Sequence, residues 1–213
     1  MDDSLLAKLE ENKSFAVGHF AIGYISSKAT AKILKTNLNI PIVLMLSVIP
    51  DIDILIPFVQ HRGPAHSIIT ALIVFIPFFA IYRKRAIPYF IALIQHFLIG
   101  DYIAAGQVQL LWPLTTQQYG TNMSIFSPTN IALEWTTFLA SIAIMVITKD
   151  AAKFFQPHNM NLLLSIPTFT VLLPTFLSFP LSVPTSLILP HLAYISLFLP
   201  SIIIDLSRAL KSI

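Results

Sequence analysis

Apolar stretches about as long as a membrane is thick recur along the whole chain. A membrane-spanning helix needs roughly 20 mostly apolar residues, and candidate spans of that kind fall at about 15–34, 40–58, 64–82, 87–105, 131–148, 161–182 and 185–204. Only 11% of the residues are charged, whereas an ordinary soluble domain carries roughly 25%. These features exclude a soluble globule and a disordered chain. They predict an all-α fold, a polytopic membrane bundle of about six or seven helices.

We expect one membrane domain over residues 1–213, because no soluble segment is large enough to fold alone. The first two spans are the weakest candidates for membrane-crossing helices, because both contain ionisable residues. Span 15–34 contains His19 and two lysines, and span 40–58 contains Asp51 and Asp53. A tilted, re-entrant or buried arrangement therefore stays open for both.

Three basic clusters follow alternate spans, and this spacing orients the bundle. They are Arg83-Lys84-Arg85 after the third span, Lys149 and Lys153 after the fifth, and Arg208 and Lys211 after the seventh. Basic residues concentrate on the cytoplasmic side of membrane proteins, so we expect the 59–63 turn and the 106–130 loop to face outward. Because the basic residues lie beside apolar spans rather than along one stripe, the net charge of +3 indicates orientation and no nucleic-acid partner.

Ionisable side chains inside the apolar region gather in the central third of the chain, with one more in the first span. They are His19, Asp51, Asp53, His61, Arg62, His66, His96 and Asp101. Such residues are costly in a membrane and are functional candidates by default. From 154 to 204 the chain has no Asp, Glu, Lys or Arg. We therefore expect the helices of 15–115 to hold the site and those of 131–205 to act as scaffold.

The segment Pro50-Asp51-Ile52-Asp53 places two carboxylates two residues apart. On a regular helix they would point about 200° apart, but in an extended or turn conformation they can share a face. A break at Pro50 would let both converge on one site. The alternative is that Asp51 caps a helix and Asp53 is a first-turn carboxylate.

The segment His61-Arg62-Gly63-Pro64-Ala65-His66-Ser67 precedes the third span. Pro64 fits the first turn of that helix, which leaves His61 and Arg62 in the loop and places His66 in the turn. Two imidazoles across a turn can approach one site. The alternative is a pair of interfacial histidines beside an arginine that reaches lipid headgroups.

His96 and Asp101 share the fourth span. Five residues on a straight helix separate their directions by about 140°. Both can serve one centre only if the centre lies against the helix or if Gly100 allows a distortion. The alternative is a buried histidine bonded to a neighbouring helix, with Asp101 at the outer end of the span.

The chain has no cysteine, so a metal site must use imidazole and carboxylate ligands. The predicted orientation places the candidate His and Asp ligands at a similar depth in the membrane. We expect a divalent ion, with Zn first and Mn or Fe as alternatives, in a site of one or two ions. The predicted ligands are His19, Asp51, Asp53, His61, His66, His96 and Asp101.

Four further polar residues are weaker candidates. Glu134, near the outer end of the fifth span, is a further ligand, a general base, or a group bonded to an indole or the backbone at the interface. We interpret His158, His191 and Asp205 as structural, because they lie at loop or scaffold positions.

Four motifs in order carry a family resemblance. They are Pro50-Asp51-Ile52-Asp53; His61-Arg62-Gly63-Pro64-Ala65-His66-Ser67; His96 with Asp101; and Gly106 leading to Leu110-Leu111-Trp112-Pro113. This order resembles the YdjM-like family of membrane-bound metal-dependent hydrolases over residues 15–115, and His19 matches the family's N-terminal histidine. The stretch 102–105 departs from the family, because it lacks the hydroxyl residue associated with that position.

The YdjM-like family is distantly similar to zinc-dependent phospholipase C and single-strand nucleases, which are helical and bind metals through His and Asp. The resemblance implies phosphoester hydrolysis by a multi-pass protein of the prokaryotic inner membrane. Metal-activated water would attack a phosphoester or lipid-like substrate from the outward-facing side. Asp53, Arg62 and His66 would be the catalytic residues, with Arg62 holding an anionic group. The expected partners are membrane lipid and a small-molecule or lipid substrate.

Two other interpretations stay open. In an ion or metal transporter, broken helices at Pro50 and Gly100 would hold a passing ion at the midplane. In a third interpretation the metal is purely structural and pins the first two spans to the bundle, which predicts a closed site with no open position for water.

Overall fold

The computed structural model describes residues 15–104, 106–121, 123–177 and 183–211, and this part of the chain is helical apart from its connections. It contains no strand, only an isolated bridge between Val108 and Tyr119. The all-α prediction is confirmed. The helices are α2 (Ala16–Leu34), α3 (Ile40–Leu46), α4 (Ile68–Tyr82), α5 (Ile87–Gln95), α6 (Pro128–Ile147), α7 (Ser165–Pro167), α8 (Leu173–Leu177) and α9 (Ile188–Lys211).

Short helical turns of other kinds connect these helices. Three of them belong to the candidate site: the 3₁₀ turns η1 (Ile49–Leu55) and η2 (Pro64–His66), and the π-helical turn η4 (His96–Asp101) that continues α5. The others are η3 (Arg83–Arg85), η5 (Ala151–Phe155), η6 (Asn161–Leu164), η7 (Thr168–Leu172) and η8 (Thr185–Leu187).

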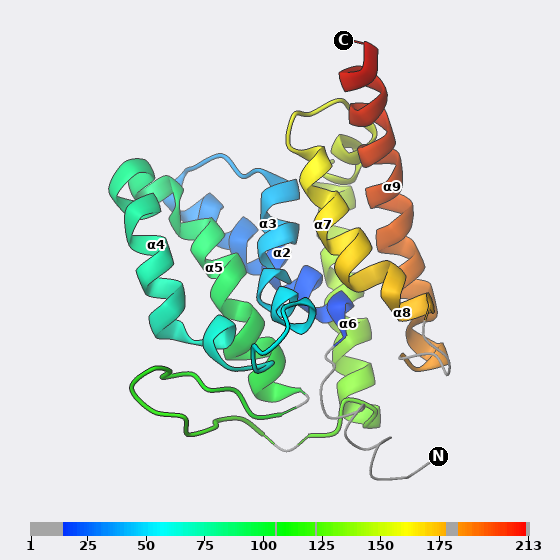
Figure 1. The fold of residues 1–213 in the computed structure, drawn as a ribbon. Helices are drawn as coiled ribbons and strands as arrows, with labels where there is room; N and C mark the ends of the chain where they lie inside the picture. Colours follow the sequence, from blue (N-terminus) through cyan, green and yellow to red (C-terminus); the bar gives the residue numbers. More distant parts are fainter. Residues whose placement is uncertain (1–14, 105, 122, 178–182, 212–213) are drawn as a thin grey trace.

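Helix α2 lies at the centre of the fold and packs against both α5 and α6. Figure 1 shows α4 and α5 on one side of it and α6 to α9 on the other. The main core forms between α2 and the C-terminal helices. There, Phe20 lies 5.1 Å from Tyr194 and 5.3 Å from Phe198, measured between ring centroids. Helix α2 therefore packs against both halves of the molecule.

The second expected span, 40–58, is not a single helix. Helix α3 begins with Asn39, whose side chain accepts a hydrogen bond from the Ile42 N–H, and it ends after seven residues. Pro50 lacks the N–H that an α-helix would need there, and the chain tightens into η1. The predicted break at Pro50 is confirmed, whereas the prediction of one span over 40–58 is wrong.

Two helices in the described residues are long and apolar enough to cross a membrane, Pro128–Ile147 and Thr185–Lys211. Helix α4 has 15 residues and rises only about 22 Å, against a hydrocarbon core of about 30 Å. Six or seven crossings are therefore not confirmed, because caps and short turns divide apolar stretches that look continuous in the sequence. Helix α4 nevertheless exposes apolar side chains such as Ile73, Ile76 and Ile81, a surface suited to lipid.

The basic clusters lie toward the same end of the molecule. Figure 1 shows the turn between α4 and α5 at the same end of the molecule as the C-terminal ends of α6 and α9. The turn carries Arg83–Arg85, and the last turn of α9 carries Arg208 and Lys211. This is the arrangement that the predicted orientation requires.

Asp150 lies just past α6 and is fully buried in a cluster of donors. Its carboxylate accepts hydrogen bonds from Tyr24 (2.7 Å), Thr148 (3.0 Å) and Lys28, and forms an ion pair with Lys153 (2.7 Å). Burial opposes ionisation, but the bonds from Lys153, Lys28, Tyr24 and Thr148 prevail and lower the pKa of Asp150 to about 2. This Asp150 cluster ties α2 to the end of α6.

Candidate metal centre

Four ligand atoms from three short turns converge beside the start of η4. The Nε2 atom of His96 lies 3.2 Å from the Nε2 atom of His66 and 3.2 Å from Oδ1 of Asp51. Oδ2 of Asp101 lies 3.3 Å from each imidazole Nε2. The fifth distance, from His66 Nε2 to Asp51 Oδ1, is 3.6 Å. We call these four residues the metal centre.

The spacing of these atoms fits a small divalent ion. Four ligands bound to zinc at about 2.0–2.1 Å, at the corners of a tetrahedron, hold their ligand atoms about 3.3–3.4 Å apart. The five distances within the centre run from 3.2 to 3.6 Å. Nitrogen and carboxylate oxygen donors also suit Mn and Fe, so the donor set does not choose among these ions.

The two imidazoles of the centre are held at their opposite nitrogens. Nδ1 of His96 lies 2.8 Å from the backbone carbonyl of Ser47. A carbonyl can only accept, so this Nδ1 carries a proton, and in the neutral ring the Nε2 lone pair is then available to an ion. Nδ1 of His66 lies 3.2 Å from Oδ2 of Asp53. Carbonyl and carboxylate partners at the far nitrogen are typical of metal-binding histidines.

Asp53 connects the centre to His61. Its Oδ1 atom is hydrogen-bonded to Nδ1 of His61 at 2.8 Å, while its Oδ2 atom faces His66. Asp51, His61 and His66 form a second group whose ligand atoms lie within 4.8 Å of one another. Asp53 thus contacts two imidazoles, and its role as a ligand stays a prediction.

His19 reaches the centre from α2. Its ring stacks on the ring of His96, with centroids 3.9 Å apart, and its Nε2 atom lies 3.8 Å from Oδ1 of Asp101. Gly100 makes room for it, because a Cβ at Gly100 would lie 2.1 Å from Cε1 of His19. His19, His96 and Asp101 form the other group of potential ligands.

The fourth span contains a distortion of the kind that would let His96 and Asp101 serve one centre. The chain from His96 to Asp101 forms a π-helical turn, which changes the angular offset that a straight α-helix would impose. His96 and Asp101 thereby meet at 3.3 Å. Turns of this kind often occur at functional sites.

When its histidines are neutral, the centre and its described neighbours carry more negative than positive charge. Asp51, Asp53 and Asp101 are each at most 8% exposed, and the buried cation beside them is Arg62. The Nε atom of Arg62 lies 3.9 Å from Oδ1 of Asp101. Buried carboxylates need compensating charge, and a divalent cation would supply it.

A family model described as YdjM inner membrane protein matches residues 15–177. The chain belongs to the YdjM inner membrane protein family. The inner-membrane location predicted from the sequence is therefore confirmed, and the two helices long enough to cross a membrane fit it. No curated protein and no solved structure matches the chain.

The YdjM match extends beyond the stretch that carries the motifs. The sequence resemblance covered residues 15–115, whereas the family model continues to 177 and includes α6, α7 and α8. The family model therefore covers residues 131–177 of the region 131–205 that we expect to act as scaffold.

Gln95 is a site residue that sequence analysis of this YdjM family member missed. It is 2% exposed, and its side-chain amide donates to the carbonyl of His19 at 3.2 Å. Glutamine carries no charge, so a pattern of ionisable residues does not reveal it. Its position directly before His96 in an apolar span was the available signal.

The remaining sequence candidates lie outside the centre. Glu134 accepts a hydrogen bond from the backbone of Gly18. Asp205 accepts from the backbone N–H of His158, and Nδ1 of His191 bonds the Leu187 carbonyl. The interpretation of these last three residues as structural stays a prediction.

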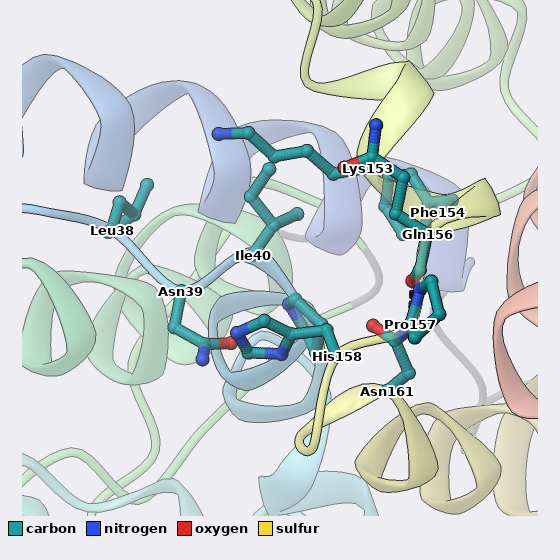
Figure 2. Close-up of a pocket in the computed structure, with 10 residues that line it drawn as sticks. Leu38, Asn39, Ile40, Lys153, Phe154, Gln156, Pro157, His158 and Asn161 are labelled. Carbon is teal, nitrogen blue, oxygen red and sulfur yellow. Dashed lines mark hydrogen bonds between the residues drawn. The ribbon is translucent and has the colours of Figure 1, made fainter. Parts of the chain in front are cut away.

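A separate hollow of about 310 Å³ lies between the start of α3 and the segment 153–161. Figure 2 shows the Lys153 side chain extending above Ile40, while the ring of His158 stands lower and points toward Asn39. The Lys153 ammonium is engaged with Asp150. The polar groups of this hollow do not converge as those of the metal centre do.

Proposed function

We propose that this YdjM-family chain is a membrane-embedded metal-dependent hydrolase. Its substrate would be a phosphoester or a lipid-like molecule reached from the outward-facing side. The observation that carries the proposal is the set of four ligand atoms, from Asp51, His66, His96 and Asp101, at tetrahedral spacing. Zinc is the first candidate ion, and Mn or Fe are alternatives.

Residues beside the four ligand atoms supply the groups that hydrolysis needs. A bound divalent ion would provide Lewis acidity and water of lowered pKa. Asp53 orients His61 through the 2.8 Å hydrogen bond to Nδ1, so that Nε2 of His61 can accept a proton. Arg62 offers a fork of N–H donors for an anionic group such as a phosphate. Asp53 also holds His66 at its far nitrogen.

A purely structural metal is the second candidate. The specific observation in its favour is that four protein atoms, with five of their six separations at 3.2–3.6 Å, could fill all four positions of a closed structural site. The Asp53–His61 pair and the buried Arg62 favour hydrolysis, because a structural ion needs neither a proton acceptor nor an anion-binding group. Turnover therefore decides between the two candidates.

We also propose that the bundle is polytopic, with the short apolar helices α4 and α5 inside the bilayer. The exposed apolar face of α4 supports this topology. The chain has no cysteine, so single cysteines introduced at Phe58 and Lys84 can be labelled from each side of the membrane. Labelling of both positions from one side would contradict the topology.

The first experiment is metal analysis of detergent-purified protein. We expect one or two Zn, Mn or Fe per chain in the wild type and their loss in His66→Ala and Asp53→Ala. His158→Ala, a histidine outside the centre, is the matched control and should keep its metal. A wild type that stays metal-free after reconstitution with Zn²⁺ would overturn the proposal.

Turnover is tested with a phosphodiester such as bis(p-nitrophenyl) phosphate and with phospholipid vesicles. We expect His61→Ala to keep its metal and to lose at least about 100-fold in rate, as removal of a general base does. Metal-loaded wild type with no activity on either substrate class would favour the structural ion.

A further inference from the structure

Glu134 holds the first turn of α2 from another helix. Its Oε2 atom accepts a hydrogen bond of 2.6 Å from the backbone N–H of Gly18, 116 residues away in the sequence. The first N–H groups of a helix have no partner within the helix, and the residue before α2, Phe15, provides no side-chain cap. Glu134, on α6, therefore supplies the cap.

The capped turn carries His19, the next residue. Its carbonyl accepts a hydrogen bond from the Gln95 side chain of α5 at 3.2 Å. The backbone on the two sides of His19 is thus held by two different helices. The imidazole between them stacks on His96 and lies 3.8 Å from Asp101.

The contact between Glu134 and Gly18 leaves no room for a side chain. A Cβ at Gly18 would lie 2.6 Å from Oε1 and 2.9 Å from Oε2 of Glu134. Glu134 is 8% exposed, so its carboxylate has little freedom to move aside. The close approach of α2 and α6 at this point depends on glycine at 18.

We infer that Glu134 is a positioning residue that sets the place of His19 at the metal centre. The inference rests on the proposed function, because it gives His19 a role toward a bound ion. Glu134 reaches the centre only through the backbone of α2, so it is neither a ligand nor a catalytic residue. Through this contact, α6 takes part in the site rather than serving only as scaffold.

The test compares Glu134→Ala and Glu134→Gln by Zn²⁺ affinity, measured by competition with a chromophoric chelator on detergent-purified protein. We expect Ala to weaken Zn²⁺ binding about 10- to 100-fold, the usual effect of losing a group that orients a ligand. Gln keeps an acceptor oxygen and should stay within about threefold of the wild type. Thr136→Ala, on the same helix and bonded to its own backbone, is the matched control and should bind like the wild type.

Two outcomes would overturn the inference. If Glu134→Ala binds Zn²⁺ as tightly as the wild type, Glu134 does not position His19, even if the variant unfolds more easily. If Gln loses as much affinity as Ala, the carboxylate acts as a ligand or through its charge. A wild type that binds no Zn²⁺ is a different result and counts against the proposed function itself.

A second measurement needs no bound ion, and it can be made on a variant that folds poorly. Modification of His19 by diethyl pyrocarbonate, followed by mass spectrometry on metal-free protein, reports whether the ring leaves its buried position. His19 is 2% exposed, so we expect slow modification in the wild type and several-fold faster modification in Glu134→Ala and in Gly18→Ala. Unchanged rates in both variants would overturn the inference whatever the wild type binds.

Discussion

Two buried carboxylate clusters within the described residues differ in how their charge is balanced. The Asp150 cluster is closed by protein groups, since two lysines and two hydroxyls surround one carboxylate. The metal centre with Asp53 gathers three carboxylates around imidazoles, with Arg62 as the buried cation beside them. The difference teaches that burial alone does not mark a functional site. A buried cluster that combines imidazoles with several carboxylates has the donor set of a cation site.

The largest expected effect is the loss of metal stabilisation at the centre. Zn²⁺ at 1,000 times its Kd should stabilise the wild type by about 4 kcal/mol, and Asp101→Asn should abolish most of this gain because it removes one ligand atom. The Tm with and without Zn²⁺ measures it. Asp150→Asn should keep the full Zn²⁺-dependent shift, and if it does not, the two clusters are not independent.

The next effect concerns the metal-free protein and is larger in the Asp150 cluster. Asp150→Asn should lower the free energy of unfolding by about 2 kcal/mol, because charged hydrogen bonds are lost. Asp101→Asn should lower it less, because Asp101 meets the imidazoles of His66 and His96 at 3.3 Å but shares its site with two other carboxylates. Denaturant unfolding without metal measures both. Equal destabilisation by the two changes would contradict the comparison.

A smaller effect is expected from Gly100→Ala. Its Cβ would lie 2.1 Å from the His19 ring, so either the ring or the π-turn must move. Such overpacking costs about 1–3 kcal/mol, and we expect a weaker Zn²⁺ affinity with it. Wild-type affinity in Gly100→Ala would show that His19 is dispensable.

The smallest effect is the pH dependence of the Asp150 cluster. The pKa of Asp150 is lowered from 3.8 to about 2, so its stabilising contribution is fully present above the ordinary value and is lost as pH falls through about 2. The Tm difference between metal-free wild type and Asp150→Asn should therefore shrink between pH 4 and pH 2. A difference that persists at pH 2 would show that charge on Asp150 is not its cause.

The helical class, the break at Pro50, the distortion at Gly100 and the inner-membrane family could all be predicted from the sequence. Each depends on local chemistry: missing N–H groups, a missing side chain, or motif residues at short spacing. The number of crossings could not be predicted, because an apolar window ignores where caps such as Asn39 end a helix. The role of Gln95 could not be predicted either, because its hydrogen bond to the His19 carbonyl joins residues that are 76 apart in the sequence.

The sequence by itself determined which residue types the candidate site contains. It also determined that the protein lies in a membrane. Apolar stretches demand a lipid environment, and a chain without cysteine limits a metal to His and carboxylate ligands. Only the tertiary structure decided which of these atoms meet. The facing of His66 and His96, the bridge of Asp53 between two imidazoles, and the capping of α2 by Glu134 join residues 8 to 116 apart in the sequence. Packing sets such distances, and no local periodicity encodes them.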